Sequence, residues 1–95
     1  EKYNKKTKQE LQKVLSGLIL ARYKVPLAER TTDLFCKDTI LYLIMELKQN
    51  EFENADIKHP IPYFTRVLQE QEKRFTGKEI TNTMIRRHEV QEMMK

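Results

Sequence analysis

Basic side chains with an aromatic partner are the chemically distinctive residues in the last third of the chain. Arg66 follows Tyr63 by three residues, a spacing that places both on one side of a helix. Within a few helical turns five more basic residues follow: Lys73, Arg74, Lys78, Arg86 and Arg87. Such side chains neutralise phosphates, and each contact adds to the affinity for nucleic acid and to its salt dependence. Tyr63 or Phe75 could stack on an unpaired base, and the alternative for both rings is packing in the core.

The net charge of +4 is unevenly distributed along the sequence. Residues 1–24 hold seven basic and two acidic side chains, residues 25–59 hold four and seven, and residues 60–95 hold seven and five. Both ends of the chain are therefore basic, and the middle is acidic. This pattern favours an anionic partner, nucleic acid before a membrane surface, with an ordinary solvated surface as the alternative.

The sequence lacks the local patterns of catalytic and metal sites. Gly17 and Gly77 are the only glycines, so there is no glycine-rich phosphate loop, and the sole serine lies in no nucleophile elbow. Cys36 is the only cysteine, and neither His59 nor His88 stands at a ligand spacing from it. We therefore predict that the protein is not an enzyme and has no catalytic residue, no metal site, no cofactor and no small-molecule substrate. Cys36 is expected in the core.

Size and composition predict one folded domain. The 95 residues suit a single hydrophobic core, and 39% hydrophobic with 34% charged residues is polar but sufficient for folding. No apolar run approaches the roughly 18 residues of a membrane span, and no signal peptide is recognisable. We expect a cytoplasmic protein without a membrane partner. Because the first residue is Glu1 rather than Met, we expect residues 1–95 to be a fragment of a longer protein.

Helical periodicity is clearest near the amino terminus. One apolar stripe at helical spacing consists of Leu11, Val14, Leu15, Leu18 and Ile19. Thr7 and Glu10 have the spacing of a capping box, which predicts a helix over residues 8–22. Gly17 weakens the middle of this helix, which suggests that another helix crosses closely there.

A second helix is predicted from Asp33 to Gln49. A corner at residues 23–26 leads into a short helical turn, and Thr31 or Thr32 then offers an N-cap. The helix that follows is apolar on more than one face, which is typical of a helix packed on two sides. We expect it to form the centre of the fold.

The last third predicts two more helices after a polar connection over residues 50–59. Pro60 and Pro62 mark the start of a helix that extends to Phe75, and Gly77 provides its left-handed cap. A final helix begins at Thr81 or Asn82. The basic tail, residues 78–95, has little apolar surface, so it is expected to be docked, mobile or ordered by a partner. Together these elements predict an all-α fold, a compact bundle of four or five helices.

Residues from Ile40 to Thr81 resemble the carboxy-terminal helical domain of the DnaD family, which occurs in plasmid replication initiators. In that family a long apolar helix and a polar connection precede a helix with the pattern Tyr-x-x-x-Ile-x-x-x-Trp, followed by a glycine and a basic tail. Tyr63 and Val67 occupy the first two positions of this pattern. Gln71 stands where the family has tryptophan, so no nucleic-acid role is carried over to that position.

The resemblance implies the carboxy-terminal domain of a DNA replication initiation protein from Gram-positive bacteria, their phages or their plasmids. Such a domain would contact DNA at an origin, or recruit host primosome components such as primase or helicase. Tyr63 would orient the motif helix, and the six basic residues named above would attract phosphate or an acidic partner surface. The alternative is a structural protein–protein interaction or oligomerisation module without nucleic-acid binding, and a homo-oligomer could form through the parent protein.

Overall fold

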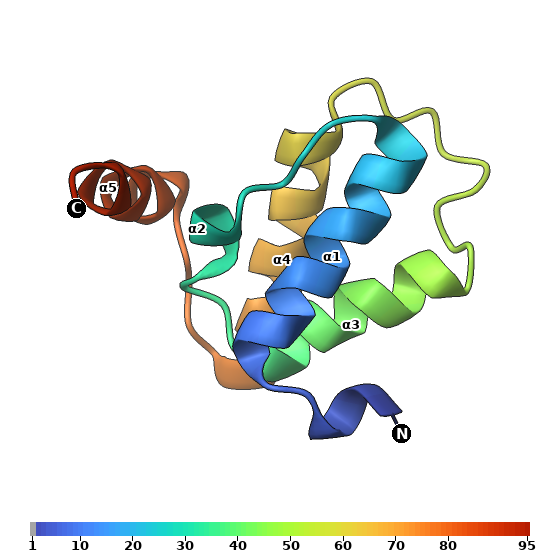
Figure 1. Cartoon of the computed structure of the whole chain (residues 1–95), viewed down its shortest axis with the longest axis horizontal. Coiled ribbons are helices and arrows are strands. Elements are labelled where there is room, and N and C mark those ends of the chain that lie inside the picture. Colours follow the sequence, from blue (N-terminus) through green and yellow to red (C-terminus); the bar gives the residue numbers. More distant parts are fainter. Residues whose placement is uncertain (1) are drawn as a thin grey trace.

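The residues described form five α-helices and one 3-10 helix, with no β-strand among them. The computed structural model describes residues 2–95, the side chain of Lys2 excepted, and Glu1, the first residue of the predicted domain, lies outside the described residues. In chain order the elements are η1 (Lys2–Lys5), α1 (Lys8–Tyr23), α2 (Glu29–Thr32), α3 (Lys37–Lys48), α4 (Pro60–Thr76) and α5 (Asn82–Met93), as shown in Figure 1. The predicted all-α bundle is confirmed.

Helix α1 begins where its capping residues predict. The Thr7 hydroxyl accepts a hydrogen bond from the Glu10 amide (3.1 Å), and the Glu10 carboxylate accepts one from the Thr7 amide (2.8 Å). The helix ends at Tyr23, and Lys24 then takes a left-handed conformation with φ of 63°. The predicted span of 8–22 is therefore correct to within one residue.

Helices α1, α3 and α4 enclose the hydrophobic core. Helix α3 packs against both α1 and α4, and Figure 1 shows it starting near the lower ends of these two helices and running to the right. The core side chains that these helices bury completely are Leu11, Leu15, Ile19, Ile40, Leu43, Ile44, Leu47, Phe64 and Leu68. The prediction that this helix packs on two sides is thus confirmed, although α2 packs against α1 and α5 rather than around it.

The predicted start of that central helix is wrong by four residues, because α3 begins at Lys37 and not at Asp33. Thr32 belongs to α2, where its hydroxyl donates to the Glu29 carbonyl (2.8 Å). The N-cap of α3 is Cys36, whose side chain makes no capping bond; the Glu72 carboxylate of α4 instead accepts from the Cys36 amide (3.0 Å). Cys36 is half-buried at this helix start rather than in the core.

Helix α4 begins at Pro60 as predicted and ends at Thr76, one residue beyond the predicted end. Gly77 caps it with φ of 76°, and its amide donates to the Lys73 carbonyl (2.8 Å). The polar segment before it, residues 50–59, is a connection made of turns. None of the helices in the described part of the chain is long and apolar enough to cross a membrane.

Helix α5 lies to one side of the three-helix core and packs against α2, as its position at the left of Figure 1 shows. Ile85 is the residue of α5 that is buried, and Ile80 is buried just before the helix. The tail is therefore helical from Asn82 onward and docked on the body of the domain.

Gly17 does not mark a helix crossing, so that expectation is wrong. It is exposed on α1, and a Cβ atom built on it would have no atom within 4 Å. The contact face of α1 is instead the opposite one, which carries Leu11, Leu15 and Ile19.

Candidate nucleic-acid interface

A groove between α4 and α5 brings two of the predicted basic residues together. Arg66 of α4 and Arg86 of α5 both line it, and both side chains are exposed. The cavity has a volume of about 320 Å³. Its other lining residues are mostly uncharged, among them Ile61, Thr65, Gln69, Asn82 and Ile85. We call this feature the α4–α5 groove.

Gln69 fixes the distance between the two helices at this groove. Its side-chain Nε2 donates to the Ile80 carbonyl (2.9 Å) and to Oδ1 of Asn82 (2.8 Å). The Thr81 hydroxyl then caps α5 by accepting from the Met84 amide (3.2 Å). Gln69 therefore sets where α5 starts, and so positions Arg86 relative to Arg66.

Polar contacts hold the middle of α5 against the segment that follows α1. The Thr31 hydroxyl donates to the Glu89 carboxylate, and Nε2 of His88 lies 2.8 Å from Oδ2 of Asp33. The buried Gln12 side chain donates to Oδ1 of the same aspartate (2.6 Å). Partial burial raises the pKa of Asp33, but the hydrogen bonds from His88 and Gln12 outweigh it, so this pKa lies below its ordinary value. Asp33 is consequently anionic at neutral pH.

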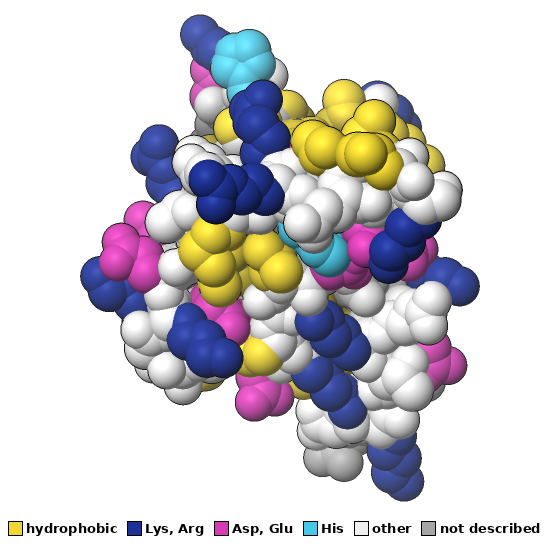
Figure 2. Space-filling view, turned by 90° about the vertical axis from the view of Figure 1, so that its left-hand side faces the viewer, with side chains coloured by type: hydrophobic (Ala, Val, Ile, Leu, Met, Phe, Trp, Pro, Cys, Tyr) yellow, Lys and Arg dark blue, Asp and Glu magenta, His cyan; other side chains and the backbone are white. Residues whose placement is uncertain are grey.

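The basic candidates carry unneutralised charge. Within residues 2–95, none of the six predicted lysines and arginines forms an ion pair with a carboxylate. Glu89 is the one carboxylate that lines the α4–α5 groove, and it already accepts from Thr31. Figure 2, which faces α5, shows basic side chains spread over this side of the molecule, with hydrophobic and acidic groups between them. The surface is a set of separate positive sites rather than a uniform basic patch.

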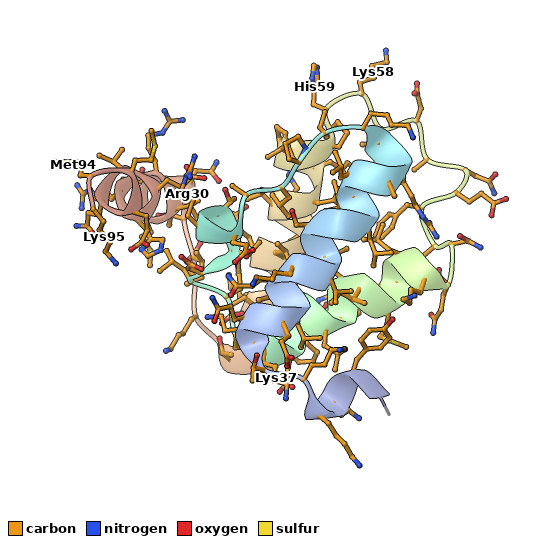
Figure 3. The ribbon with its side chains drawn as sticks, in the orientation of Figure 1. Arg30, Lys37, Lys58, His59, Met94 and Lys95 are labelled. Carbon is orange, nitrogen blue, oxygen red and sulfur yellow. The ribbon has the colours of Figure 1, made fainter. Side chains whose placement is uncertain are left out.

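Tyr63 borders a second groove beside the first. That groove has a volume of about 580 Å³ and lies between residues 56–59 and the first turns of α4, with Arg66 on its edge. The Tyr63 ring is 40% exposed, and it also packs edge-on against Phe52 (5.9 Å) and Phe64 (5.3 Å). Lys58 and His59 extend outward at this end of the molecule (Figure 3). Tyr63 therefore combines a packing contact with an accessible face.

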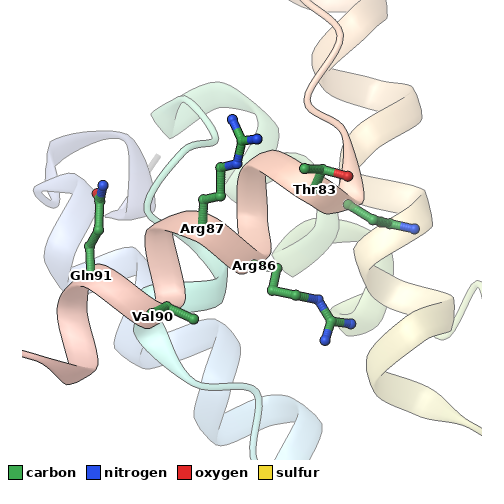
Figure 4. Close-up of a pocket in the computed structure, with 6 residues that line it drawn as sticks. Thr83, Arg86, Arg87, Val90 and Gln91 are labelled. Atoms are coloured by element: carbon green, nitrogen blue, oxygen red, sulfur yellow. The ribbon is translucent and has the colours of Figure 1, made fainter.

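The remaining candidates do not share one surface. Lys73 lines a third recess together with Arg66, where Glu70 and Glu79 also lie. Arg86 and Arg87 are neighbours in sequence, yet their guanidinium groups point apart on α5 (Figure 4). Both nevertheless line a recess along α5 with Val90 and Gln91, and of the two only Arg86 also lines the α4–α5 groove.

Arg74, Phe75 and Lys78 lie outside the α4–α5 groove. The Phe75 ring, 50% exposed, packs edge-on against Tyr42 of α3 with centroids 6.3 Å apart. Burial and the nearby Glu46 carboxylate raise the pKa of Tyr42, and the charge of Arg74 opposes them. Of the seven predicted residues, Arg66, Lys73 and Arg86 are thus gathered around one region, with Tyr63 adjoining it.

Sequence reasoning missed two features of this region. The role of Gln69 was invisible because its partners are 11 and 13 residues away in other elements. The convergence of Asp33, His88 and Glu92, whose potential ligand atoms lie within 4.8 Å of one another, was also missed. The only local signal for it was the four-residue spacing of His88 and Glu92 on one helix face.

No protein-family model matches this chain, and neither does any curated protein or any solved structure. Gln71, which stands at the tryptophan position of the DnaD pattern, is buried in α4. That position therefore belongs to the packed side of the helix and lies away from the grooves.

Proposed function

We propose that this domain is the carboxy-terminal domain of a cytoplasmic DNA replication initiation protein and that it contacts DNA through the α4–α5 groove. The observation that carries the proposal is the pair of Arg66 and Arg86. They come from two helices, line one groove, and are free of carboxylate partners among the residues described. Arginine is suited to this role because its planar guanidinium can donate two parallel hydrogen bonds to a phosphate.

The surroundings of the two arginines suit a nucleic-acid backbone. Thr65 and Asn82 line the groove beside them and can hydrogen-bond phosphate or sugar oxygens. Arg66 also borders the groove of Tyr63, where an unpaired base could stack on the exposed face of the ring. Lys73 extends the positive charge along α4. A strand passing Arg66 could therefore meet both grooves.

The resemblance of residues 40–81 to the DnaD family supports the wider role. In that role the domain would work at an origin of a plasmid, phage or Gram-positive chromosome and bring in host primase or helicase. The basic residues outside the groove, Arg74, Lys78 and Arg87, would then be available to an acidic protein surface. Arg74 and Lys78 do not line the groove of the Arg66–Arg86 pair, which would allow DNA and protein to bind at different places.

The test is a titration of single-stranded and duplex oligonucleotides with the domain at several salt concentrations, in which fluorescence anisotropy measures the binding. The double variant Arg66→Ala/Arg86→Ala should bind more weakly. It should also flatten the slope of log K against log salt by about 0.7–0.9 per lost phosphate contact. The control Lys13→Ala/Arg22→Ala removes the same charge from exposed positions on α1, outside the α4–α5 groove, and should change the slope less.

Two results would count against the proposal. Equal losses in both double variants would show attraction by net charge rather than a site at the groove. No salt-dependent binding by the unaltered domain would remove DNA as its ligand.

A second candidate function, a protein–protein or oligomerisation module, is favoured by the apolar residues exposed along α5. Val90, Met93 and Met94 are 48%, 66% and 80% exposed, which is the kind of surface that a partner helix covers. Sedimentation equilibrium of the isolated domain, with Met93→Lys as the variant, separates the two functions. A dimer abolished by Met93→Lys, together with no DNA binding, would favour this second function.

A further inference from the structure

Three potential metal ligands converge where α5 packs on α2. His88 and Glu92 are four residues apart on α5, so their side chains leave the same face of the helix. Asp33 follows directly after α2. One ligand atom from each of the three lies within 4.8 Å of the other two, and the Asp33 and His88 atoms are 2.8 Å apart. Ligands bound tetrahedrally to Zn²⁺ at about 2.1 Å are about 3.4 Å from one another, so small side-chain rotations would complete the geometry.

The Asp33 carboxylate is held in position by a hydrogen bond from Gln12 to the oxygen that does not face His88. Gln12 is buried, and its Nε2 donates to Oδ1 of Asp33 (2.6 Å), to the Thr32 hydroxyl (2.9 Å) and to the Glu29 carbonyl (3.1 Å). Such outer contacts orient a ligating carboxylate and strengthen metal sites. They leave Oδ2, the oxygen that faces His88, free to bind an ion. The side chains of Asp33, His88 and Glu92 are each partly exposed, so water can fill the remaining coordination positions.

Two lysines lie beside the three potential ligands and would compete with a bound ion. Lys95 Nζ lies 2.7 Å from Oε2 of Glu92, and Lys8 Nζ donates to the backbone carbonyl of Asp33. The Lys95 side chain is 72% exposed, and Figure 3 shows it at the free end of α5, so it can be displaced into solvent. The nearby positive charge weakens the binding of any divalent ion, and it is the imidazole ligand that favours Zn²⁺ and its neighbours over Ca²⁺ and Mg²⁺, which prefer oxygen ligands.

From this geometry we propose that Asp33, His88 and Glu92 bind a divalent transition-metal ion, with Zn²⁺ as the representative ion, which fastens α5 to the body of the domain. On binding, Asp33 and His88 would exchange their mutual hydrogen bond for bonds to the ion, with His88 as the neutral imidazole protonated at Nδ1, and Glu92 would exchange Lys95 for the ion. None of the three ligands lines the α4–α5 groove, so the ion would not contact DNA bound there.

The experiment is a calorimetric titration of ZnCl₂ into the untagged 95-residue chain, repeated with variants. The unaltered chain should bind one Zn²⁺, and Zn²⁺ should raise its Tm. His88→Ala and Glu92→Gln should each weaken binding by about tenfold or more, and Glu92→Gln keeps the size of the side chain in case His88→Ala loosens α5. Lys95→Met should tighten binding several-fold because it removes the competing ammonium. His59→Ala, the matched histidine control in the exposed connection, should leave binding unchanged.

The absence of saturable Zn²⁺ binding would overturn the proposal and leave the cluster as an ion-pair network only. Loss of binding in His59→Ala with retention in His88→Ala would also overturn it, because it would place the ion elsewhere. DNA binding is measured with the same variants. If His88→Ala and Glu92→Gln still bind DNA, a negative result for Zn²⁺ leaves the proposed function of the α4–α5 groove untouched.

Discussion

The three-helix core of α1, α3 and α4 and the arm formed by α2 and α5 are held together by different forces. The core buries complete aliphatic and aromatic side chains from all three of its helices. The arm buries only Ile85 from α5 and depends on polar contacts: Thr31 with Glu89, Asp33 with His88, and Gln69 with Asn82. Hydrophobic burial gives several kcal/mol per large side chain, while an ordinary hydrogen bond contributes about 1 kcal/mol. We therefore expect the arm to open more easily than the core.

This difference bears on the candidate site, because the α4–α5 groove lies where the two regions meet. Arg66 belongs to the stable core, whereas Arg86 belongs to the arm. A ligand that bridges both arginines would be bound only when the arm is docked. By thermodynamic linkage, such a ligand would also stabilise the docked arm.

Phe64→Ala should break the core and produce the largest effect. Phe64 is completely buried and packs against Tyr23 and Phe52, both with ring centroids 5.2 Å away. The free energy of unfolding should fall by about 3–5 kcal/mol, as measured by urea denaturation. Phe75→Ala, at a half-exposed ring, should cost much less. A similar loss from both would mean that the aromatic cluster is not the centre of stability.

Ile85→Ala should loosen the arm and leave the core nearly intact. Removing its buried side chain should cost about 2–5 kcal/mol of α5 docking energy. Hydrogen exchange should therefore speed up in α5 while the amides of α1 and α3 stay protected. Val90→Ala, on an exposed face of the same helix, is the control. Equal acceleration in all helices would show that arm and core unfold together, and would end the distinction between them.

Glu72→Ala tests a polar contact that joins α4 to the start of α3. Its carboxylate accepts from the Cys36 amide at the start of α3, where the helix dipole also favours negative charge. Loss of this acceptor should cost about 1–3 kcal/mol, because it leaves the Cys36 amide without a partner. Glu72→Gln retains an oxygen acceptor and should lose less. An unchanged midpoint in urea for Glu72→Ala would show that water replaces the carboxylate without cost.

The same residue predicts how stability depends on pH. Burial raises the pKa of Glu72, but hydrogen bonds from Thr39 and Cys36 lower it more, so its folded-state pKa is below the ordinary value. The stabilisation is complete above the unfolded-state pKa of about 4.3 and is lost as pH falls through the folded-state value. Urea midpoints measured from pH 7 down to pH 3 should therefore fall more steeply for the unaltered chain than for Glu72→Gln. Parallel curves would contradict this.

The sequence predicts the helices whose ends are determined locally. Thr7 with Glu10, Pro60 and Gly77 mark helix ends through bonds or conformations within a few residues, and those ends were predicted to within one residue. The start of α3 was missed because its acceptor, Glu72, is 36 residues away in sequence. Thr31 and Thr32 have the side chains of good N-caps, but in the structure they belong to α2, and Asp33 contacts His88 of α5. The capping preference alone could not reveal this.

The candidate site was predictable only as a set of residue types. Charge composition identified Arg66, Lys73 and Arg86, but it could not separate them from Arg74 on α4 and Lys78 in the connection after α4, which line neither of these recesses. Arg86 and Arg87 show the limit most clearly, because both line the recess along α5, yet a step of about 100° around the helix axis leaves only Arg86 at the α4–α5 groove. Which side chains share a groove follows from helix packing, and that packing depends on long-range contacts such as those of Gln69.

Substitutions of the two glycines should have the smallest effects on the free energy of unfolding, and these effects should have opposite signs. Gly17 lies exposed in the middle of α1 with open space around its missing Cβ atom, so Gly17→Ala should stabilise the core by up to about 1 kcal/mol through helix propensity. Gly77 also has open space, but its φ of 76° is strained for any side chain, so Gly77→Ala should destabilise by about 1–2 kcal/mol. Paired thermal and urea unfolding of the two variants would measure the opposite signs. Destabilisation by Gly17→Ala would instead reveal a close contact on that face, such as one made by a partner or a second copy of the chain.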